Sequence, residues 1–343
     1  MPLNTKILNH ILHAQGNFNT LALEVFAYQF QHCQTYQAYC RRLNKTPDQV
    51  SHWKDIPAVS TEVFREYNLC TLPPETAQYV FQTSGTSQEI KGKHYYHDLT
   101  LYQAAIQMSF MKGLGLKPQT RALFRVLTPS FTEVSTSSLY FMFQKVLEWY
   151  GEPGSRFYFK NNELDEAQLI QDLQEDATLN RPVILLGTAF SFVNFCDYLQ
   201  EQQIILKCPP GSRLLETGGL KGRTRTVSRP ELYQHFSHLL GLELNHCFSE
   251  YGMTELSSQC YSQPNSHHFI SPPWMSIQII DPETGKEVEP GKTGLVQFFD
   301  LANLTAVSAV ITSDLAIRLD PGFELQGRAP QAIIRGCSTV FEK

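Results

Sequence analysis

A loop of hydroxyl, glycine and lysine residues at 83–92 is the part of this sequence best suited to chemistry on phosphate. It reads Thr-Ser-Gly-Thr-Ser-Gln-Glu-Ile-Lys-Gly and follows an apolar run at 79–81. Glycine lets the backbone approach a polyphosphate, hydroxyls and N–H groups bond its oxygens, and lysine neutralises its charge. The spacing is not that of a Walker A loop, and a polar turn is the alternative for such a loop taken alone. The predicted phosphate-binding residues are Thr83, Ser84, Gly85, Thr86, Ser87 and Lys91.

This loop resembles the phosphate loop of the adenylate-forming superfamily, which contains acyl-CoA synthetases, luciferases and the adenylation domains of peptide synthetases. The loop of that family usually reads Ser-Gly-Thr-Thr-Gly-x-Pro-Lys-Gly. Gln88 and Ile90 stand where the family has its second glycine and its proline. The matching positions are Ser84, Gly85, Thr86, Lys91 and Gly92.

Two further segments resemble motifs of the same superfamily and follow in the family's order. Residues 216–220 resemble the glycine-rich stretch that lies along adenine, and residues 248–255 resemble the Tyr-Gly-x-Thr-Glu motif. The resemblance implies that Thr254 bonds the α-phosphate and that Glu255 holds Mg²⁺, which prefers carboxylate oxygens. Taken alone, the two segments are a strand-terminating turn and a loop with one buried tyrosine. The implied adenine contacts are Gly218, Gly219, Tyr251 and Gly252.

Asp314 and Arg328 stand in two more segments of this kind. Thr-Ser-Asp-Leu at 312–315 resembles Thr-Gly-Asp-Leu, whose aspartate accepts hydrogen bonds from the ribose hydroxyls, a role that needs only two carboxylate oxygens. Gly327-Arg328 resembles the Gly-Arg that follows, with its arginine near ribose and phosphate. Pro330 and Ile334 replace the family's hinge aspartate and its lysine. A turn aspartate and a solvated turn arginine are the alternatives.

The end of the sequence resembles one branch of the superfamily, the LuxE-type acyl-protein synthetases, which activate fatty acids in bacterial bioluminescence. That resemblance implies that the chain lacks the C-terminal lid domain of other adenylate-forming enzymes. A cysteine near the C-terminus of LuxE proteins accepts the acyl group, and Cys337 matches it by position. Arg335 lies two residues away and would lower the pKa of the thiol. The alternative for Cys337 is a small residue in a Gly-Cys-Ser turn.

Together these resemblances imply an acid–thiol ligase that uses ATP and Mg²⁺. Its carboxylic acid, a fatty acid by the LuxE resemblance, would be adenylated, and Cys337, a carrier protein or CoA would then take the acyl group. The aromatic residues at 129–143 and 189–192 suit an acyl pocket and equally suit a core. Two alternatives remain: a protein that hands acyl-adenylate to a partner such as a reductase, and a non-catalytic nucleotide-binding protein. The implied catalytic residues are Lys91, Thr254, Glu255, Arg328 and Cys337.

The elements that must position these residues alternate between helices and strands. Helical spacing is expected over much of 1–70, at 100–113, at 164–173 and after 188. Strands are expected at 121–127, 183–186 and 214–217, and short strands with Gly and Pro turns follow at 276–280, 294–299, 309–312 and 322–325. This pattern predicts layered α/β sheets, mostly parallel, in which ligands lie beyond the carboxyl ends of the strands. The expected domains are a helical segment at 1–75, an α/β core at 76–275 and a β-rich subdomain with a short tail at 276–343.

Composition narrows the class of protein. A net charge of -5 argues against a nucleic-acid binder, which is usually basic. We expect no membrane span, because no long uninterrupted apolar stretch is present, and no signal peptide is visible at the N-terminus. The eight cysteines form no C-x-x-C pair, and most are expected to be buried and reduced, which favours a cytoplasmic location.

Overall fold

The computed structural model describes residues 1–83, 90–160, 163–218 and 227–330. The chain is divided into two compact units. Unit 1 comprises Met1–Met108, Met253–Gln259 and the chain from His268 onward, and unit 2 comprises Ser109–Gly252 and Cys260–His267. The three-domain division expected from the sequence stays a prediction.

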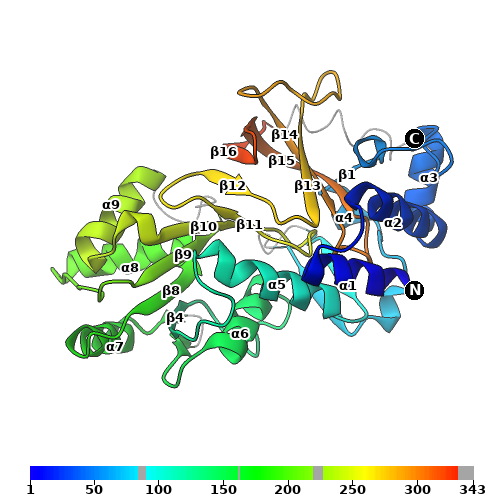
Figure 1. The fold of residues 1–343 in the computed structure, drawn as a ribbon. Helices are drawn as coiled ribbons and strands as arrows, with labels where there is room; N and C mark the ends of the chain where they lie inside the picture. The colour runs from blue at the N-terminus through cyan, green and yellow to red at the C-terminus, as the bar shows by residue number, and fades with distance from the viewer. Residues whose placement is uncertain (84–89, 161–162, 219–226, 331–343) are drawn as a thin grey trace. The chain divides into compact units, whose positions relative to one another are not determined.

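The strands of unit 2 follow the order β11-β10-β9-β8-β4-β5, and Figure 1 labels all of them except β5. The five strands from β10 to β5 in this order run parallel to one another, and β11 pairs with β10 in antiparallel fashion. β8 and β9 are buried along almost their whole length, and the first four residues of β8 form a continuous apolar run. The strands are β4 (Leu123–Leu127), β5 (Arg156–Phe157), β8 (Val183–Thr188), β9 (Arg213–Thr217), β10 (Cys247–Tyr251) and β11 (Cys260–Ser262), with β6 (Phe159–Lys160) and β7 (Glu163–Leu164) forming a separate pair.

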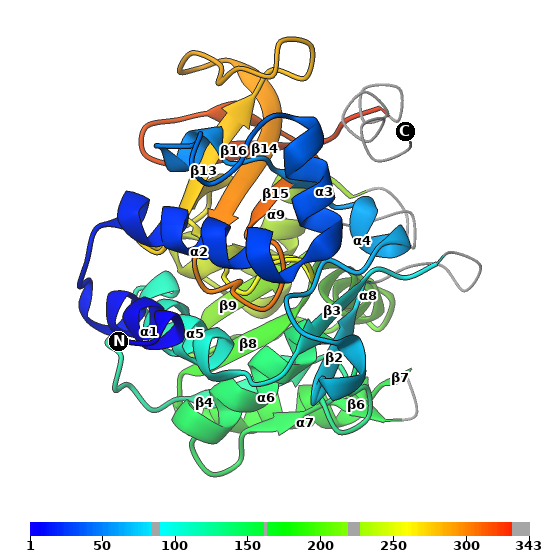
Figure 2. The ribbon, with the colours of Figure 1, turned by 90° about the vertical axis from the view of Figure 1, so that its right-hand side faces the viewer.

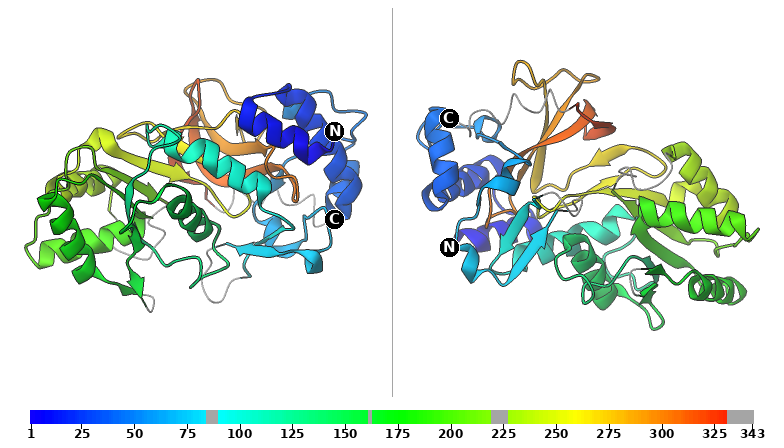
Figure 3. Two further views of the ribbon diagram at one scale, coloured as in Figure 1. Left: turned by 60° about the horizontal axis from the view of Figure 1, so that its bottom comes forward. Right: turned by 180° about the vertical axis from the view of Figure 1, so that it is seen from behind.

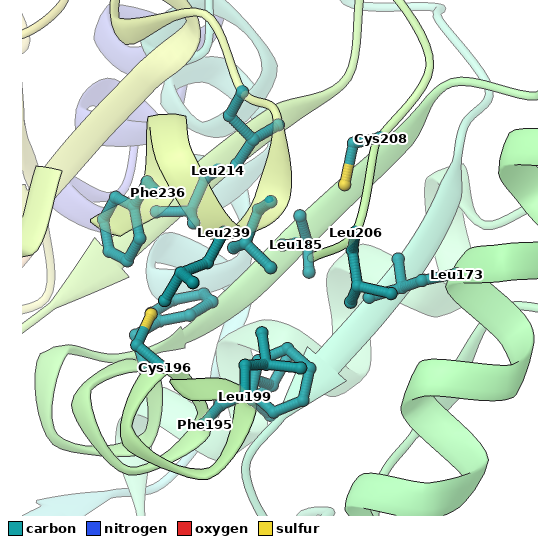
Figure 4. Packing of buried hydrophobic residues seen from close by; sticks show 14 of the residues in the cluster. Leu173, Leu185, Phe195, Cys196, Leu199, Leu206, Cys208, Leu214, Phe236 and Leu239 are labelled. Carbon is teal, nitrogen blue, oxygen red and sulfur yellow. The ribbon is translucent and has the colours of Figure 1, made fainter. Parts of the chain in front are cut away.

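Helices of unit 2 pack their apolar side chains on this sheet. Leu173 of α7, Leu199 of α8 and Leu239 of α9 meet Leu185 of β8 and Leu214 of β9 in one buried cluster (Figure 4). The helices begin at side-chain caps: Thr188 accepts a hydrogen bond from the N–H of Ser191 at the start of α8. Their bounds are α6 (Ser138–Tyr150), α7 (Glu166–Thr178), α8 (Ala189–Glu201) and α9 (Arg229–Leu240), with a 3-10 turn η3 (Leu244–His246); α5 (Thr100–Gly113) begins in unit 1 and ends in unit 2.

Unit 1 holds an antiparallel sheet in the order β13-β14-β15-β16-β12. The first half of β15 also pairs with β1 in parallel, and its second half pairs with β16. A separate antiparallel hairpin is made by β2 and β3, drawn in cyan in Figure 2. The strands are β1 (Val59–Ser60), β2 (Tyr79–Gln82), β3 (Lys93–Tyr96), β12 (His268–Ile270), β13 (Met275–Ile280), β14 (Thr293–Asp300), β15 (Ala309–Arg318) and β16 (Phe323–Arg328).

N-terminal helices cover part of the unit 1 sheet. In Figure 2 and in the left view of Figure 3 the blue helices lie beside the orange strands. Phe18 at the start of α2 packs edge-on against Phe299 of β14, and Gln29 further along α2 bonds the backbone beyond β14. The helices are α1 (Leu3–His13), α2 (Phe18–His32), α3 (Gln34–Arg42) and α4 (Val63–Glu66), with the 3-10 turns η1 (Trp53–Asp55) and η2 (Pro74–Thr76).

The expected α/β layers and the β-rich region after 276 are confirmed. Helix α5 spans the expected 100–113, and β8 and β9 contain the predicted strands. The predicted end of the strand at 312 is wrong, because β15 continues through Asp314 to Arg318, where it is held on one side by β14 and on the other by β16. No helix among the described residues is both long and apolar enough to cross a membrane.

Candidate active site

The β2–β3 hairpin of unit 1 closes the two ends of the predicted phosphate loop. The N–H of Thr83 donates to the carbonyl of Gly92, 3.0 Å away, and the N–H of Gly92 donates to Oγ1 of Thr83, also at 3.0 Å. A Cβ at position 92 would lie 3.1 Å from Cγ2 of Thr83, so a side chain there would crowd this contact. Thr83 keeps its own hydroxyl hydrogen for another acceptor, and Lys91, the residue before Gly92, is exposed. Ser84, Gly85, Thr86 and Ser87 lie outside the described residues.

Thr254 and Glu255 are attached to this hairpin and to the loop that follows β14. The hydroxyl of Thr254 donates to the carbonyl of Gln82, 3.3 Å away and directly before Thr83. The carbonyl of Thr254 accepts a hydrogen bond from Nδ1 of His94 at 2.8 Å, and the carbonyl of Glu255 accepts one from Nδ2 of Asn303 at 3.0 Å. The structure therefore brings Thr83 and Thr254 together within unit 1.

Asp314 and Arg328 face each other across β15 and β16, where they are register partners. Nε of Arg328 lies 3.4 Å from Oδ1 of Asp314, and the Arg328 side chain is 58% exposed against 17% for Asp314. The N–H of Asp314 donates to Oγ1 of Thr312 at 3.1 Å. These contacts place a partly covered carboxylate beside an exposed guanidinium, as a site for a sugar hydroxyl and a phosphate would require.

Unit 2 carries the residues predicted to contact adenine. Thr217 of β9 and Glu250 of β10 are register partners, so Gly218 and Tyr251 follow at the same carboxyl edge of the two parallel strands. Gly218 has φ +75° and open space where a Cβ would lie. Tyr251 is buried and Gly252 is exposed. Gly219 lies outside the described residues.

Two buried carboxyl groups, Glu216 on β9 and Glu250 on β10, lie on opposite faces of the sheet, and neither was assigned a role from the sequence alone. Glu250 accepts a hydrogen bond from the hydroxyl of Thr217, and burial, with a contribution from the charge of Glu216, raises its pKa to about 7. Burial also raises the pKa of Glu216, which lies 3.7 Å from Nε of Arg229 and 3.5 Å from the hydroxyl of Tyr233. Successive side chains along a strand point to opposite faces of the sheet, so the sequence alone predicts that Glu216 and its neighbour Thr217 lie on different faces.

The cysteines in the described part of the chain are poor nucleophiles. All are buried except Cys70, which is half-buried. Burial raises the pKa of Cys33 to about 11 and that of Cys40, Cys196, Cys208 and Cys247 to about 12, so these thiols stay protonated at neutral pH. The expectation that most cysteines are buried is confirmed. Cys337 lies outside the described residues.

Comparison with solved structures defines the class of fold. A 2-hydroxyisobutyryl-CoA ligase in complex with its acyl-AMP and CoA matches over 90% of this chain and 74% of its own, with a TM-score of 0.67 and 15% identity. An ATP-bound structure of MatB from Rhodopseudomonas palustris matches over 85% of this chain and 56% of its own, with a TM-score of 0.52 and 15% identity. The fold is therefore that of the adenylate-forming ligases.

The family model described as acyl-protein synthetase, LuxE, matches residues 13–343. The chain belongs to this family, and with it to the acid–thiol ligases. A long-chain-fatty-acid–luciferin-component ligase of Aliivibrio fischeri is 23% identical over 300 residues, which cover 87% of this chain and 78% of that protein.

Proposed function

We propose that this chain transfers the AMP group of ATP to a long-chain fatty acid, forming acyl-adenylate and releasing pyrophosphate. The acyl group then passes to a thiol. Membership of the acyl-protein synthetase family supports the reaction class. The observation that carries the assignment to residues is the 3.3 Å hydrogen bond from Thr254 to the carbonyl of Gln82. It joins the residue assigned to the α-phosphate to the strand that leads into the phosphate loop.

The first step is an in-line displacement at phosphorus. A carboxylate oxygen of the acid bonds to the α-phosphorus while the bond from that phosphorus to the bridging oxygen breaks, and pyrophosphate leaves with the electron pair. Lys91 and the hydroxyl of Thr83 hold the departing phosphates, together with Ser84, Gly85, Thr86 and Ser87. The hydroxyl of Thr254 exchanges its hydrogen bond to the carbonyl of Gln82 for one to the α-phosphate. A donor aimed at the charge that develops there stabilises the transition state.

Glu255 fits the Mg²⁺ that accompanies ATP. Mg²⁺ in such sites is held by one or two carboxylates plus substrate phosphates and keeps several waters. Glu255, the residue after Thr254, would supply the one carboxylate that such a site needs, and the phosphates of ATP would supply the other oxygens. When bound, Mg²⁺ neutralises charge on the phosphate oxygens.

The remaining residues orient the nucleoside. Asp314 accepts hydrogen bonds from the ribose hydroxyls, and Arg328 contributes positive charge near the ribose and phosphate. Gly218, Gly219, Tyr251 and Gly252 contact adenine, where glycine permits a flat base to lie against the backbone.

A thiol then attacks the acyl carbonyl, and AMP leaves as the new thioester forms. We propose Cys337 as this thiol, and transfer to CoA, a carrier protein or a reductase partner as the later fate of the acyl group. A thiol must be accessible and deprotonated to attack. The described cysteines are buried except Cys70, and the pKa of the Cys70 thiol is raised, which supports Cys337 or an external thiol as the acceptor.

Release of pyrophosphate from Mg-ATP tests this proposal when it is measured over fatty acids of increasing chain length, followed by intact mass of the protein. We expect acid-dependent release, a mass gain on the wild type, and loss of that gain in Cys337→Ser with release retained. Glu255→Gln should lose release, whereas its control Glu283→Gln, at an exposed turn, should keep it. Absence of release with every acid would overturn the proposal, and release without a mass gain would assign the acyl group to an external thiol.

A further inference from the structure

The backbone on both sides of Glu255 is fixed by buried side chains from distant parts of unit 1. The peptide group before Glu255 contains the carbonyl of Thr254, which accepts from His94 at 2.8 Å. The peptide group after it contains the carbonyl of Glu255, which accepts from Asn303 at 3.0 Å. The two peptide planes that flank a residue determine the direction of its Cα–Cβ bond. His94 and Asn303 therefore set the direction in which the side chain of Glu255 leaves the backbone.

His94 is well suited to this task because its ring is buried and packed against a second aromatic ring. It is 1% exposed, and its ring stacks on that of Tyr96 with centroids 4.1 Å apart. Burial lowers its pKa to about 4, so the ring is neutral at physiological pH, and Nδ1 must carry the hydrogen because a carbonyl only accepts. The Tyr96 hydroxyl lies 2.9 Å from Oγ of Ser257, two residues beyond Glu255. The β3 strand thus contacts the segment on both sides of Glu255.

Asn303 has its amide orientation fixed by its partners. Nδ2 donates to the carbonyls of Glu255 and Val307, at 3.0 and 2.9 Å, and Oδ1 accepts from the hydroxyl of Ser257 at 2.9 Å. Its own carbonyl accepts from Nε2 of Gln29, a side chain of α2 that is 1% exposed. Because Asn303 is fully buried, loss of any of these bonds would leave a polar group without a partner or require water to enter.

We propose that His94 and Asn303 are positioning residues that aim Glu255 at the metal–phosphate complex, an inference that rests on the proposed function. His94 also ties Glu255 to the phosphate loop, because it stands on β3, directly after Gly92 and Lys93. The hairpin that carries Thr83 and Lys91 therefore also fixes the backbone of Thr254. A shift of the hairpin moves both groups together and preserves their relative geometry.

Substitution of His94 tests the inference with a matched control. His94→Leu removes the donor, whereas His94→Asn keeps an N–H at the position of Nδ1. His10→Leu is the control, because His10 is also buried and its Nδ1 also bonds a backbone carbonyl, that of Gln15 at 2.9 Å, within α1 and its following turn. We expect His94→Leu to lower kcat for pyrophosphate release roughly tenfold to hundredfold, as misplacement by about an ångström does. His94→Asn should recover most of the loss, and His10→Leu should stay near wild type.

A binding measurement separates positioning from general stability. Calorimetry of each folded variant with ATP, with and without Mg²⁺, should show that His94→Leu loses part of the gain in affinity that Mg²⁺ gives, while its affinity for metal-free ATP is unchanged. Asn303→Ser should behave in the same way if it folds. A folded His94→Leu with wild-type kcat and the wild-type Mg²⁺ gain would overturn the inference. An inactive wild type would instead count against the proposed function.

Discussion

At the scale of single residues, the ion pair of Asp314 and Arg328 contributes more to the orientation of the Asp314 carboxylate than to the stability of the fold. The guanidinium is 58% exposed, and exposed pairs of this kind contribute about 1 kcal/mol or less. The carboxylate, in contrast, is largely covered, and the backbone N–H of Asp314 donates to the hydroxyl of Thr312. The contact with Arg328 limits the orientations open to the carboxylate, which suits the ribose contact proposed for Asp314.

Asp314→Asn should weaken binding of ATP while leaving the fold intact. Hydrogen bonds to a charged group contribute about 1.5–3 kcal/mol, so we expect the KM for ATP to rise about tenfold to hundredfold. Steady-state pyrophosphate release checks this. Asp320→Asn, the same change in the turn after β15, serves as the control and should leave the KM unchanged. Equal KM values for the two variants would show that Asp314 does not contribute to the binding of ATP.

Glu250→Gln should change how stability depends on pH. The folded pKa of Glu250, about 7, lies above its ordinary value of 4.5, so the folded state binds the proton more tightly than the unfolded state. The unfolding free energy of the wild type therefore falls as pH rises from 4.5 to 7 because of this group. The amide introduced by the substitution does not titrate and can still accept from Thr217, so the variant should gain up to about 3 kcal/mol relative to wild type across this window.

Urea unfolding at several pH values measures this difference. Glu201→Gln, at the exposed end of α8, is the control and should show no such trend. A difference between Glu250→Gln and wild type that stays constant from about pH 4 to about pH 8 would mean that Glu250 has an ordinary pKa.

At the scale of elements, a buried ion pair joins β4 to α7 in unit 2. Nε and Nη2 of Arg125 donate to the two carboxylate oxygens of Asp176 at 2.8 and 2.9 Å, and Asp176 is fully buried. Breaking a buried pair by removing one partner costs about 3–5 kcal/mol, because the other charge stays buried. Asp176→Asn should lower the unfolding free energy by about this amount in urea titration. Glu175→Gln, its 60% exposed neighbour, should change it by less than about 1 kcal/mol.

The sequence was sufficient to predict elements that have strong local patterns. Helix α5 is rich in apolar residues and free of interior glycine and proline, β8 begins with a short apolar run, and Gly218 follows β9 as a strand-end glycine should. The passage of β15 through Ser313 and Asp314 could not be predicted, because polar residues have low strand propensity and only the neighbouring strands impose the conformation.

Contacts between distant residues were also out of reach of the sequence. His94 and Thr254 are 160 positions apart, and Asn303 and Glu255 are 48 apart. Neither His94 nor Asn303 belongs to a motif, and a period-two pattern on β3 says which face a side chain takes but not what it meets. The residues proposed to contact ATP were predicted by resemblance, whereas the residues that hydrogen-bond their backbone became visible only in the fold.

At the scale of the whole molecule, each unit carries its own part of the proposed assignments. Gly218 and Tyr251, proposed for adenine, belong to unit 2, and Thr83, Thr254 and Asp314, proposed for phosphate and ribose, belong to unit 1. The chain passes from one unit to the other within the 248–255 motif, between Gly252 and Met253. A measurement of the complete first half-reaction therefore tests all these assignments together.

Isotope exchange between pyrophosphate and ATP is the most direct test of the central claim, because it reports reversible formation of acyl-adenylate without any thiol. The wild type should catalyse exchange only when Mg²⁺ and a long-chain fatty acid are both present, and Glu255→Gln should reduce that exchange strongly. Binding of ATP without exchange for any carboxylic acid would show that the protein does not form an acyl-adenylate.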